Sequence, residues 1–139
     1  MSLNAFCDGA CRVSNPGETS CAFVVFEGEK LIAWESRYLG PELHSNNHAE
    51  YQGLLSLLRW AAVNKIYNLN IYCDSQLVVN QVNDVWDVNS AELMPLWRIA
   101  YALKVRGRHT LTHIKGHAGN EGNELADWFC NKILDMEGK

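Results

Sequence analysis

The residues of this sequence best suited to chemistry are carboxylates that border apolar segments. Glu50 is one of them. In a helix it would share one side with Leu54, Leu57, Leu58 and Ala61, which follow it by four, seven, eight and eleven positions. A carboxylate on that apolar face is costly unless a cation or hydrogen-bond donors compensate it. The alternative is a first-turn glutamate that favours the helix dipole and turns out to water.

Two aspartates each follow a short apolar run that is predicted to form a β-strand. Asp8 follows Leu3–Cys7, and Asp74 follows Asn68–Cys73. If these strands are parallel neighbours, the two carboxylates lie near one another on the sheet. Open α/β sheets bind ligands in the crevices beyond their strand ends, so this place is a candidate site.

A fourth carboxylate, Asp127, is harder to place. It shares a polar stripe of the last predicted helix with Glu124, Asn131 and Asp135, so periodicity alone favours a solvated face. The other three, if they converge, need cations, and hard oxygen ligands suit magnesium or manganese. Such a site serves in-line displacement at phosphorus best, with one ion activating water and a second stabilising the leaving oxygen.

The composition is that of a soluble globular protein. The chain has 139 residues, 47% hydrophobic and 20% charged, so we expect a single domain spanning residues 1–139. No apolar run approaches the ~20 residues of a membrane span, and the start has no signal-peptide pattern. Five cysteines without a metal-type pair are typical of buried thiols in a reducing compartment. We therefore expect a cytoplasmic protein with no membrane partner.

The charge is unevenly distributed. The net charge of −4 argues against a protein that coats nucleic acid with its whole surface. The segment from Leu93 to Asn120, however, contains no Asp or Glu and holds five of the twelve basic residues: Arg98, Lys104, Arg106, Arg108 and Lys115. It is either a solvated helix face and loop or a surface for an anionic partner.

The elements that must position these groups can be predicted from periodicity and turn signals. Strands are expected at 3–7, 21–26, 31–39, 68–73 and 109–114, and helices at 47–64, from a Ser75 cap through 82, 91–105 and 123–136. A glycine-rich loop holding Gly116, Gly119 and Gly122 precedes the last helix. Three hairpin-linked strands followed by strands alternating with helices predict an α/β fold with a five-stranded mixed sheet. Its first three strands are antiparallel, its later additions are parallel, and helices flank it.

Several motifs in sequence order resemble a known family. Asp8-Gly9-Ala10, Asn46-Asn47-x-Ala49-Glu50, Cys73-Asp74-Ser75-Gln76, Lys115-Gly116-His117-Ala118-Gly119 and Asn123-Glu124-Leu125-Ala126-Asp127 look like the signatures of type 1 ribonuclease H. Each motif is weak alone, but together they cover essentially the whole chain. The resemblance implies a ribonuclease H-like fold and endonucleolytic cutting of RNA in RNA–DNA hybrids, leaving 3′-hydroxyl and 5′-phosphate ends.

The same resemblance implies roles for the reactive residues. Asp8, Glu50, Asp74 and Asp127 would be the metal-binding quartet for two Mg²⁺ ions, with Mn²⁺ as a possible substitute. It thereby assigns Asp127, which periodicity does not. His117 resembles the family's mobile histidine, which assists proton transfer or product departure, and an imidazole with a pKa near ~6.5 suits either role.

Other residues are implied to meet the hybrid. Asn47 and Gln76 resemble residues on the minor-groove side of the RNA strand, where the 2′-hydroxyl distinguishes RNA from DNA. Ser45 and Asn46 neighbour them and could reach either strand. Asn15 looks like part of a pocket for a DNA phosphate. Trp86 is a further candidate, which could stack on a DNA sugar or simply pack between helices. Lys115 and Asn123 are the remaining candidates for binding the hybrid.

The sequence departs from the family in two places. The segment from Asp8 to Asn15 is one residue longer than in the commonest bacterial pattern, which weakens the transfer to Asn15. The basic protrusion that grips the hybrid in many members is replaced by a short acidic connection with Asp84, Asp87 and Glu92. We therefore expect weak, salt-sensitive binding through Arg98 to Lys115, and a loss on replacing Arg106 and Arg108 together by alanine.

Other functions remain possible at this point. A related metal nuclease acting on DNA, such as a junction resolvase, would share the fold, and a catalytically weak hybrid-binding module would bind without cutting. His109, His113 and His117 have a zinc-like spacing on a helix, but on a strand leading into a loop they would not converge. We expect a monomer with no obligate protein partner, because no heptad or large apolar surface stands out.

Overall fold

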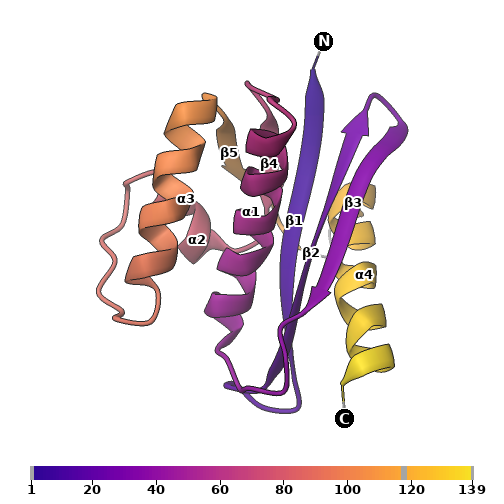
Figure 1. Ribbon diagram of the computed structural model, residues 1–139, viewed down its shortest axis with the longest axis vertical. Coiled ribbons are helices and arrows are strands. Elements are labelled where there is room, and N and C mark those ends of the chain that lie inside the picture. Colours follow the sequence, from indigo (N-terminus) through magenta and orange to yellow (C-terminus); the bar gives the residue numbers. More distant parts are fainter. Residues whose placement is uncertain (1, 117–118, 139) are drawn as a thin grey trace.

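The computed structural model describes residues 2–116 and 119–138, which form nine elements (Figure 1). In chain order they are β1 (Leu3–Arg12), β2 (Glu18–Glu27), β3 (Lys30–Tyr38), α1 (Asn46–Val63), β4 (Asn70–Cys73), α2 (Gln76–Val82), α3 (Met94–Gly107), β5 (Thr110–His113) and α4 (Glu121–Glu137). None of these helices is long and apolar enough to cross a membrane.

The five strands form one mixed sheet in the order β3-β2-β1-β4-β5. β1 pairs with β2, and β2 with β3, antiparallel, whereas β1 with β4 and β4 with β5 are parallel. In Figure 1, α1 and α3 lie in front of the sheet and α4 lies behind it, where it packs against β1, β2 and β3. The predicted fold class is confirmed, and the parallel pairing of the first and fourth strands, which the sequence left open, is observed.

The main core lies between the sheet and α1. Ala5 and Cys7 of β1 point into it with Ile71 and Cys73 of β4, as expected for alternate residues of paired strands. The apolar side of α1 packs onto them through fully buried residues that include Leu54, Leu57, Leu58 and Ala61. The stripe read from the sequence therefore does face the sheet.

The first strand continues past the predicted end. Its residues pair with β2 in register from Leu3 opposite Glu27 to Arg12 opposite Glu18, so antiparallel pairing extends the strand beyond its apolar half. The prediction that Asp8 ends the strand was therefore wrong. Asp8 instead stands one residue beyond Cys7, the last residue that pairs with β4.

The last two helices also begin elsewhere than predicted. α3 begins at Met94 rather than Ala91, because Ser90 Oγ accepts a hydrogen bond from the Leu93 N–H and closes a separate turn. α4 begins at Glu121, capped by Asn120, whose side chain accepts from the Asn123 N–H. Gly122 thus belongs to the helix and not to the loop, and it packs directly on the Phe6 ring, where a Cβ would collide.

Candidate active site

Parallel pairing of β1 with β4 brings Asp8 and Asp74 together. Cys7 stands opposite Cys73 in the register, so the next residue on each strand is an aspartate. β4 ends there, and the Ile114 N–H donates to the Cys73 carbonyl, so β5 reaches the same end of the sheet. The two carboxylates consequently stand side by side where the parallel part of the sheet opens.

Helix α1 supplies Glu50 to the same place. The Gly9 N–H donates to Glu50 Oε1 at 2.5 Å and to Asp8 Oδ1 at 2.9 Å, which ties the two carboxylates to one backbone amide. Glu50 is only 7% exposed, so the alternative of a first-turn glutamate that turns out to water is excluded.

Glycines make this close approach of helix and strand possible. A Cβ on Gly9 would collide with the Ala49 and Glu50 backbone, and a Cβ on Gly53 would collide with the Asp8 carbonyl. On the far side of the site, a Cβ on Gly116 would come within 2.8 Å of Asp74 Oδ2. Sequence reasoning missed these three packing roles, since no local pattern reveals which glycine meets a distant backbone.

Asp8, Glu50 and Asp74 form a compact cluster of hard oxygen donors. One carboxylate oxygen from each lies within 4.8 Å of the others. Across residues 2–116 and 119–138, no Lys or Arg forms an ion pair with any of the three; the one Lys or Arg ion pair joins Arg12 to Asp135. Buried carboxylates without a cationic partner fit a divalent cation with a preference for oxygen ligands.

The electrostatics of the cluster also fit cation binding. Burial, and next the charge of Asp74, raises the pKa of Asp8 to about 8. Burial raises the pKa of Glu50 well above its ordinary value, and its neighbours in the site add to this. At neutral pH the metal-free cluster therefore holds protons, and a bound cation would displace them.

Asp8→Asn is expected to stabilise the metal-free protein at pH 8. The folded-state pKa of about 8 lies above the ordinary 3.8, so the folded protein binds the extra proton between these values and its stability falls as pH rises through them. The gain should be a few kcal/mol at pH 8, because each pKa unit is worth about 1.4 kcal/mol, and should vanish near pH 4. Urea unfolding with chelator at both pH values measures it, and a variant less stable than wild type at pH 8 would contradict it.

Asp127 lies beside this cluster but is not part of it. Cys130, one turn further along α4, donates from its thiol to the Asp8 carbonyl at 3.5 Å, and the charge of Asp127 contributes to the raised pKa of Asp8. Its Oδ1 accepts from Asn131 Nδ2 at 3.3 Å. The carboxylate thus faces the site from a half-buried position on α4.

The start of α1 gathers four of the substrate-binding candidates. Ser45 caps the helix, accepting from the His48 N–H, and donates from Oγ to Glu92 Oε1 at 2.7 Å. The Asn46 N–H donates to Asn15 Oδ1 at 2.9 Å, so Asn15 does reach this point despite the longer segment before it. Asn47 follows with a half-exposed side chain.

Two histidines here were missed by sequence reasoning. The rings of His44 and His48 stack with centroids 4.1 Å apart, on either side of Asn46 and Asn47. Spacing by four indicates contact only within a helix, and His44 precedes the cap, so no sequence signal could have found the pair.

The remaining candidates are spread around the site. Gln76 is the exposed first residue of α2, and Trp86 is exposed in the connection after it rather than packed between helices. Lys115 is exposed after β5, whereas Asn123 is buried in the first turn of α4. His117 lies outside the described residues.

The zinc interpretation finds no support among the described histidines. His109 is buried, and its Nδ1 accepts from the Leu69 N–H at 3.0 Å, which makes it a structural residue. His113 is exposed at the end of β5.

The basic segment is divided between the two ends of β5. Lys115 adjoins Gly116 at the carboxylate end of β5, whereas Arg106 and Arg108 precede β5 at its other end, where α3 finishes at the top of Figure 1. The four residues of β5 rise about 3.3 Å each, so the two groups stand at least roughly 13 Å apart. Arg106 and Arg108 therefore do not lie beside the carboxylates, and their joint effect on hybrid binding stays a prediction.

The mixed five-stranded sheet, with clustered carboxylates beside the ends of its central parallel strands, defines a ribonuclease H-like protein. The chain belongs to the RNase H family, whose model matches residues 1–134. The family is metal-dependent, in agreement with the acidic cluster.

Similar proteins agree with this assignment. Ribonuclease HI of Halobacterium salinarum is 32% identical over 96% of the chain, and the chain spans 64% of its length. Ribonuclease H of Francisella philomiragia is 31% identical over 97% of the chain and 93% of its own length. The crystal structure of RNase H1 from Halobacterium salinarum superposes with a TM-score of 0.85 at 30% identity, covering 98% of this chain and 99% of that one.

Proposed function

We propose that this chain hydrolyses the RNA strand of RNA–DNA hybrids internally and leaves 3′-hydroxyl and 5′-phosphate ends. The observation that carries the proposal is the cluster of Asp8, Glu50 and Asp74 in a member of the RNase H family. A module that only binds the hybrid would gain nothing from carboxylates clustered without cationic side chains. Such a cluster instead suits metal cations that act on a phosphodiester.

Two Mg²⁺ ions would be held by Asp8, Glu50, Asp74 and Asp127, and Mn²⁺ could substitute. When bound, such ions activate the attacking water and stabilise the leaving oxygen. The chain itself supplies rigid placement: the Gly9 amide fixes one oxygen each of Asp8 and Glu50, and β4 holds Asp74 beside them. His117 is the proposed group for proton transfer or product release.

Recognition would use the polar residues around α1 and α2. Asn47 and Gln76 would meet the RNA strand, where the 2′-hydroxyl offers both a donor and an acceptor. The bond between Asn15 and the Asn46 amide supports a pocket for a DNA phosphate at the start of α1, with Ser45 beside it. The exposed ring of Trp86 would stack on a DNA sugar.

The test is cleavage of a labelled RNA strand paired with DNA, in Mg²⁺, in Mn²⁺ and with chelator. Parallel reactions contain single-stranded RNA, an RNA–RNA duplex and duplex DNA. Internal cuts in the hybrid that chelator abolishes would establish the function and show which metals support it. Cutting of duplex DNA instead would indicate a DNA nuclease, and tight binding without cutting in either metal would indicate a binding module.

Lys115→Ala is expected to weaken hybrid binding several-fold, because Lys115 is an exposed cation at the end of β5 that lies next to the carboxylate cluster. The salt dependence of binding should become shallower by about one counterion, as expected for the loss of one phosphate contact. Both quantities are measured by the fluorescence anisotropy of a labelled hybrid, with Lys115→Ala introduced into a catalytically inactive variant so that the hybrid is not cut. Arg108→Ala is the matched control at the other end of β5, and equal losses from the two variants would contradict the assignment.

A further inference from the structure

The outer edge of β3 is an unpaired strand edge. β3 is the terminal strand of the sheet, and within residues 2–116 and 119–138 no strand pairs with its other side. The Leu39 N–H donates to the Thr19 carbonyl, so by alternation the amides and carbonyls of Trp34, Ser36 and Tyr38 point away from β2. Natural edge strands are often blunted by a proline, a bulge or a charge. Residues 34–38 contain no proline, and the irregularity in the pairing of β3 with β2 lies before them, between Leu31 and Ala33. Their two charges, Glu35 and Arg37, are of opposite sign, so this stretch still offers backbone groups to a further strand of suitable charge.

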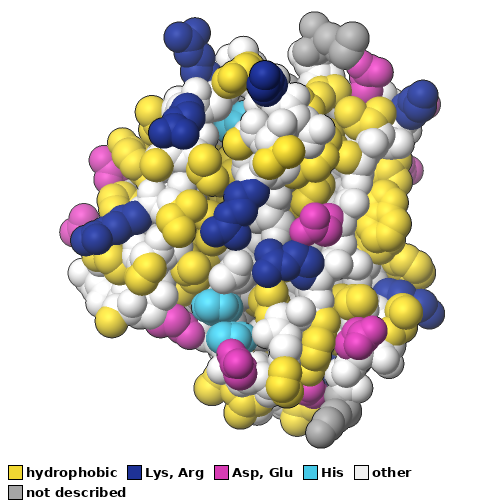
Figure 2. All heavy atoms as spheres, in the orientation of Figure 1, with side chains coloured by type: hydrophobic (Ala, Val, Ile, Leu, Met, Phe, Trp, Pro, Cys, Tyr) yellow, Lys and Arg dark blue, Asp and Glu magenta, His cyan; other side chains and the backbone are white. Residues whose placement is uncertain are grey.

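The α4 side of this edge is apolar and exposed. Trp34 is 54% exposed and stacks flat on Phe129 of α4, with ring centroids 4.5 Å apart. Trp128 and Met136 of α4 are 55% and 67% exposed, and these side chains line a hollow of about 250 Å³ together with Ser36, Ile133 and one charged residue, Lys132. Figure 2 shows hydrophobic side chains gathered along the right-hand side of the view, where β3 and α4 lie.

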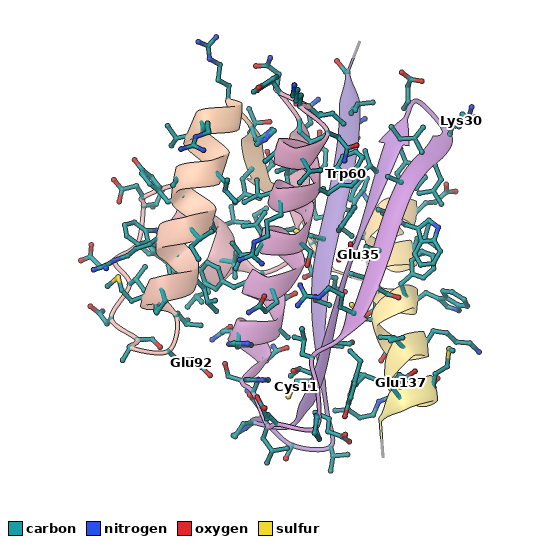
Figure 3. The ribbon with its side chains drawn as sticks, viewed as in Figure 1. Cys11, Lys30, Glu35, Trp60, Glu92 and Glu137 are labelled. Atoms are coloured by element: carbon teal, nitrogen blue, oxygen red, sulfur yellow. The ribbon has the colours of Figure 1, made fainter. Side chains whose placement is uncertain are left out.

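On the α1 side of this edge, β3 itself contributes one charge of each sign. Glu35 and Arg37 line the groove between β3 and α1 together with Arg59 of α1, and Figure 3 shows Glu35 between these elements, with Trp60 above it on α1. In the described part of the chain, neither side chain has an oppositely charged group within ion-pair distance. Arg37 Nη1 donates to Ser56 Oγ at 2.8 Å, which holds the guanidinium in place.

We propose that a second copy of this chain pairs with the edge of β3, antiparallel, about a two-fold axis at Ser36. In this register Trp34, Ser36 and Tyr38 face Tyr38, Ser36 and Trp34 of the second copy, and all of these residues have outward backbone groups. Glu35 then stands opposite Arg37 of the second copy, and Arg37 opposite its Glu35, at the non-hydrogen-bonded positions where side chains approach most closely. The edge is thus complementary to itself in backbone pairing, in charge and in aromatic contact.

The pairing also covers the apolar side. With neighbouring strands ~4.8 Å apart, β2 and β2 of the second copy lie roughly 14 Å apart. Because α4 packs on β1 as well as on β2, the axes of the two α4 helices would stand roughly 19 Å apart, against about 8–10 Å for directly packed helices. Trp128 and Met136, exposed on α4 beside Trp34, would fill part of the space between them. The sequence gives no sign of this surface, because its residues come from segments far apart in the chain.

The test is sedimentation velocity and light scattering of the full chain from low to high micromolar concentration at low salt. Wild type is expected to reach twice its mass of 15.7 kDa. Glu35→Arg and Arg37→Glu should each raise the dimer dissociation constant at least tenfold, because each places like charges face to face. The chain carrying both changes restores opposite charges and should recover the dimer. Lys30→Glu, on the same strand but outside the paired stretch, is the matched control.

Several results would overturn the proposal. They are a wild type that stays monomeric at every concentration, a dimer that neither single reversal weakens, or a double variant that remains monomeric although circular dichroism shows it folded. Hybrid cleavage per chain should be equal in all variants, since none of these residues belongs to the carboxylate site, so the outcome does not depend on the proposed activity.

Discussion

Asp74→Asn is expected to abolish cleavage of the RNA–DNA hybrid while leaving the protein folded. The amide keeps the shape of the side chain but removes one of the four carboxylate charges proposed to hold the cations, and cation chemistry contributes several kcal/mol to such reactions. A loss of about 4 kcal/mol of transition-state stabilisation is a rate reduction of about 10³-fold. Single-turnover cleavage of labelled RNA in Mg²⁺ and in Mn²⁺ measures it.

The matched control is Glu29→Gln, which removes one negative charge from the exposed turn between β2 and β3. It should cleave like wild type. If Asp74→Asn kept more than a tenth of the wild-type rate in both metals, the cluster would not be the site of the reaction. With chelator, the thermal unfolding temperature of Asp74→Asn should equal or exceed that of wild type, because the variant removes the negative charge of Asp74, which helps to raise the pKa of Asp8.

The strands of the sheet could be predicted where apolar runs and turn signals coincide. The exact residues at which the strands end could not be predicted. The closeness of Asp8 and Asp74 was expected only if the first and fourth strands were parallel neighbours, and the register shows that they are. The continuation of β1 through Gly9 and Arg12 has no local signal, because those residues have low strand propensity and only their pairing with β2 makes them extended. Tertiary pairing therefore decided the boundary.

The apolar stripe of its helix left Glu50 open between an inward and an outward direction, and the structure buries it. Asp127 could not be found in this way, since its stripe on α4 also contains exposed residues and its closeness to Asp8 arises from the docking of α4 on β1. The sequence left two roles open for Trp86, packing between helices and contact with the hybrid. Its exposed side chain favours contact with the hybrid. The stacked pair of His44 and His48 depends on the bend before α1, which periodicity does not describe.

Gly53→Ala is expected to destabilise the protein by about 2–4 kcal/mol and to slow cleavage by about 10- to 100-fold. In an isolated helix this change would stabilise by about 1 kcal/mol. Here the new Cβ would collide with the Asp8 carbonyl and lie 3.2 Å from its carbon, and these are strand backbone atoms that cannot move aside. Helix α1 must therefore lift from β1, which carries Glu50 away from Asp8, and a displacement of about 1 Å can cost about 10²-fold in rate.

Urea unfolding and hybrid cleavage, measured on the same preparation, test both parts of this expectation. Arg59→Ala is the matched control, because it introduces alanine at an exposed position of the same helix and should change neither quantity. Gly53→Ala with wild-type stability and rate would mean that α1 does not depend on contact with the Asp8 backbone. Lost stability with an unchanged rate would mean that Glu50 keeps its place through the Gly9 amide even when the helix shifts, so the hydrogen bond, rather than the helix packing, positions the carboxylate.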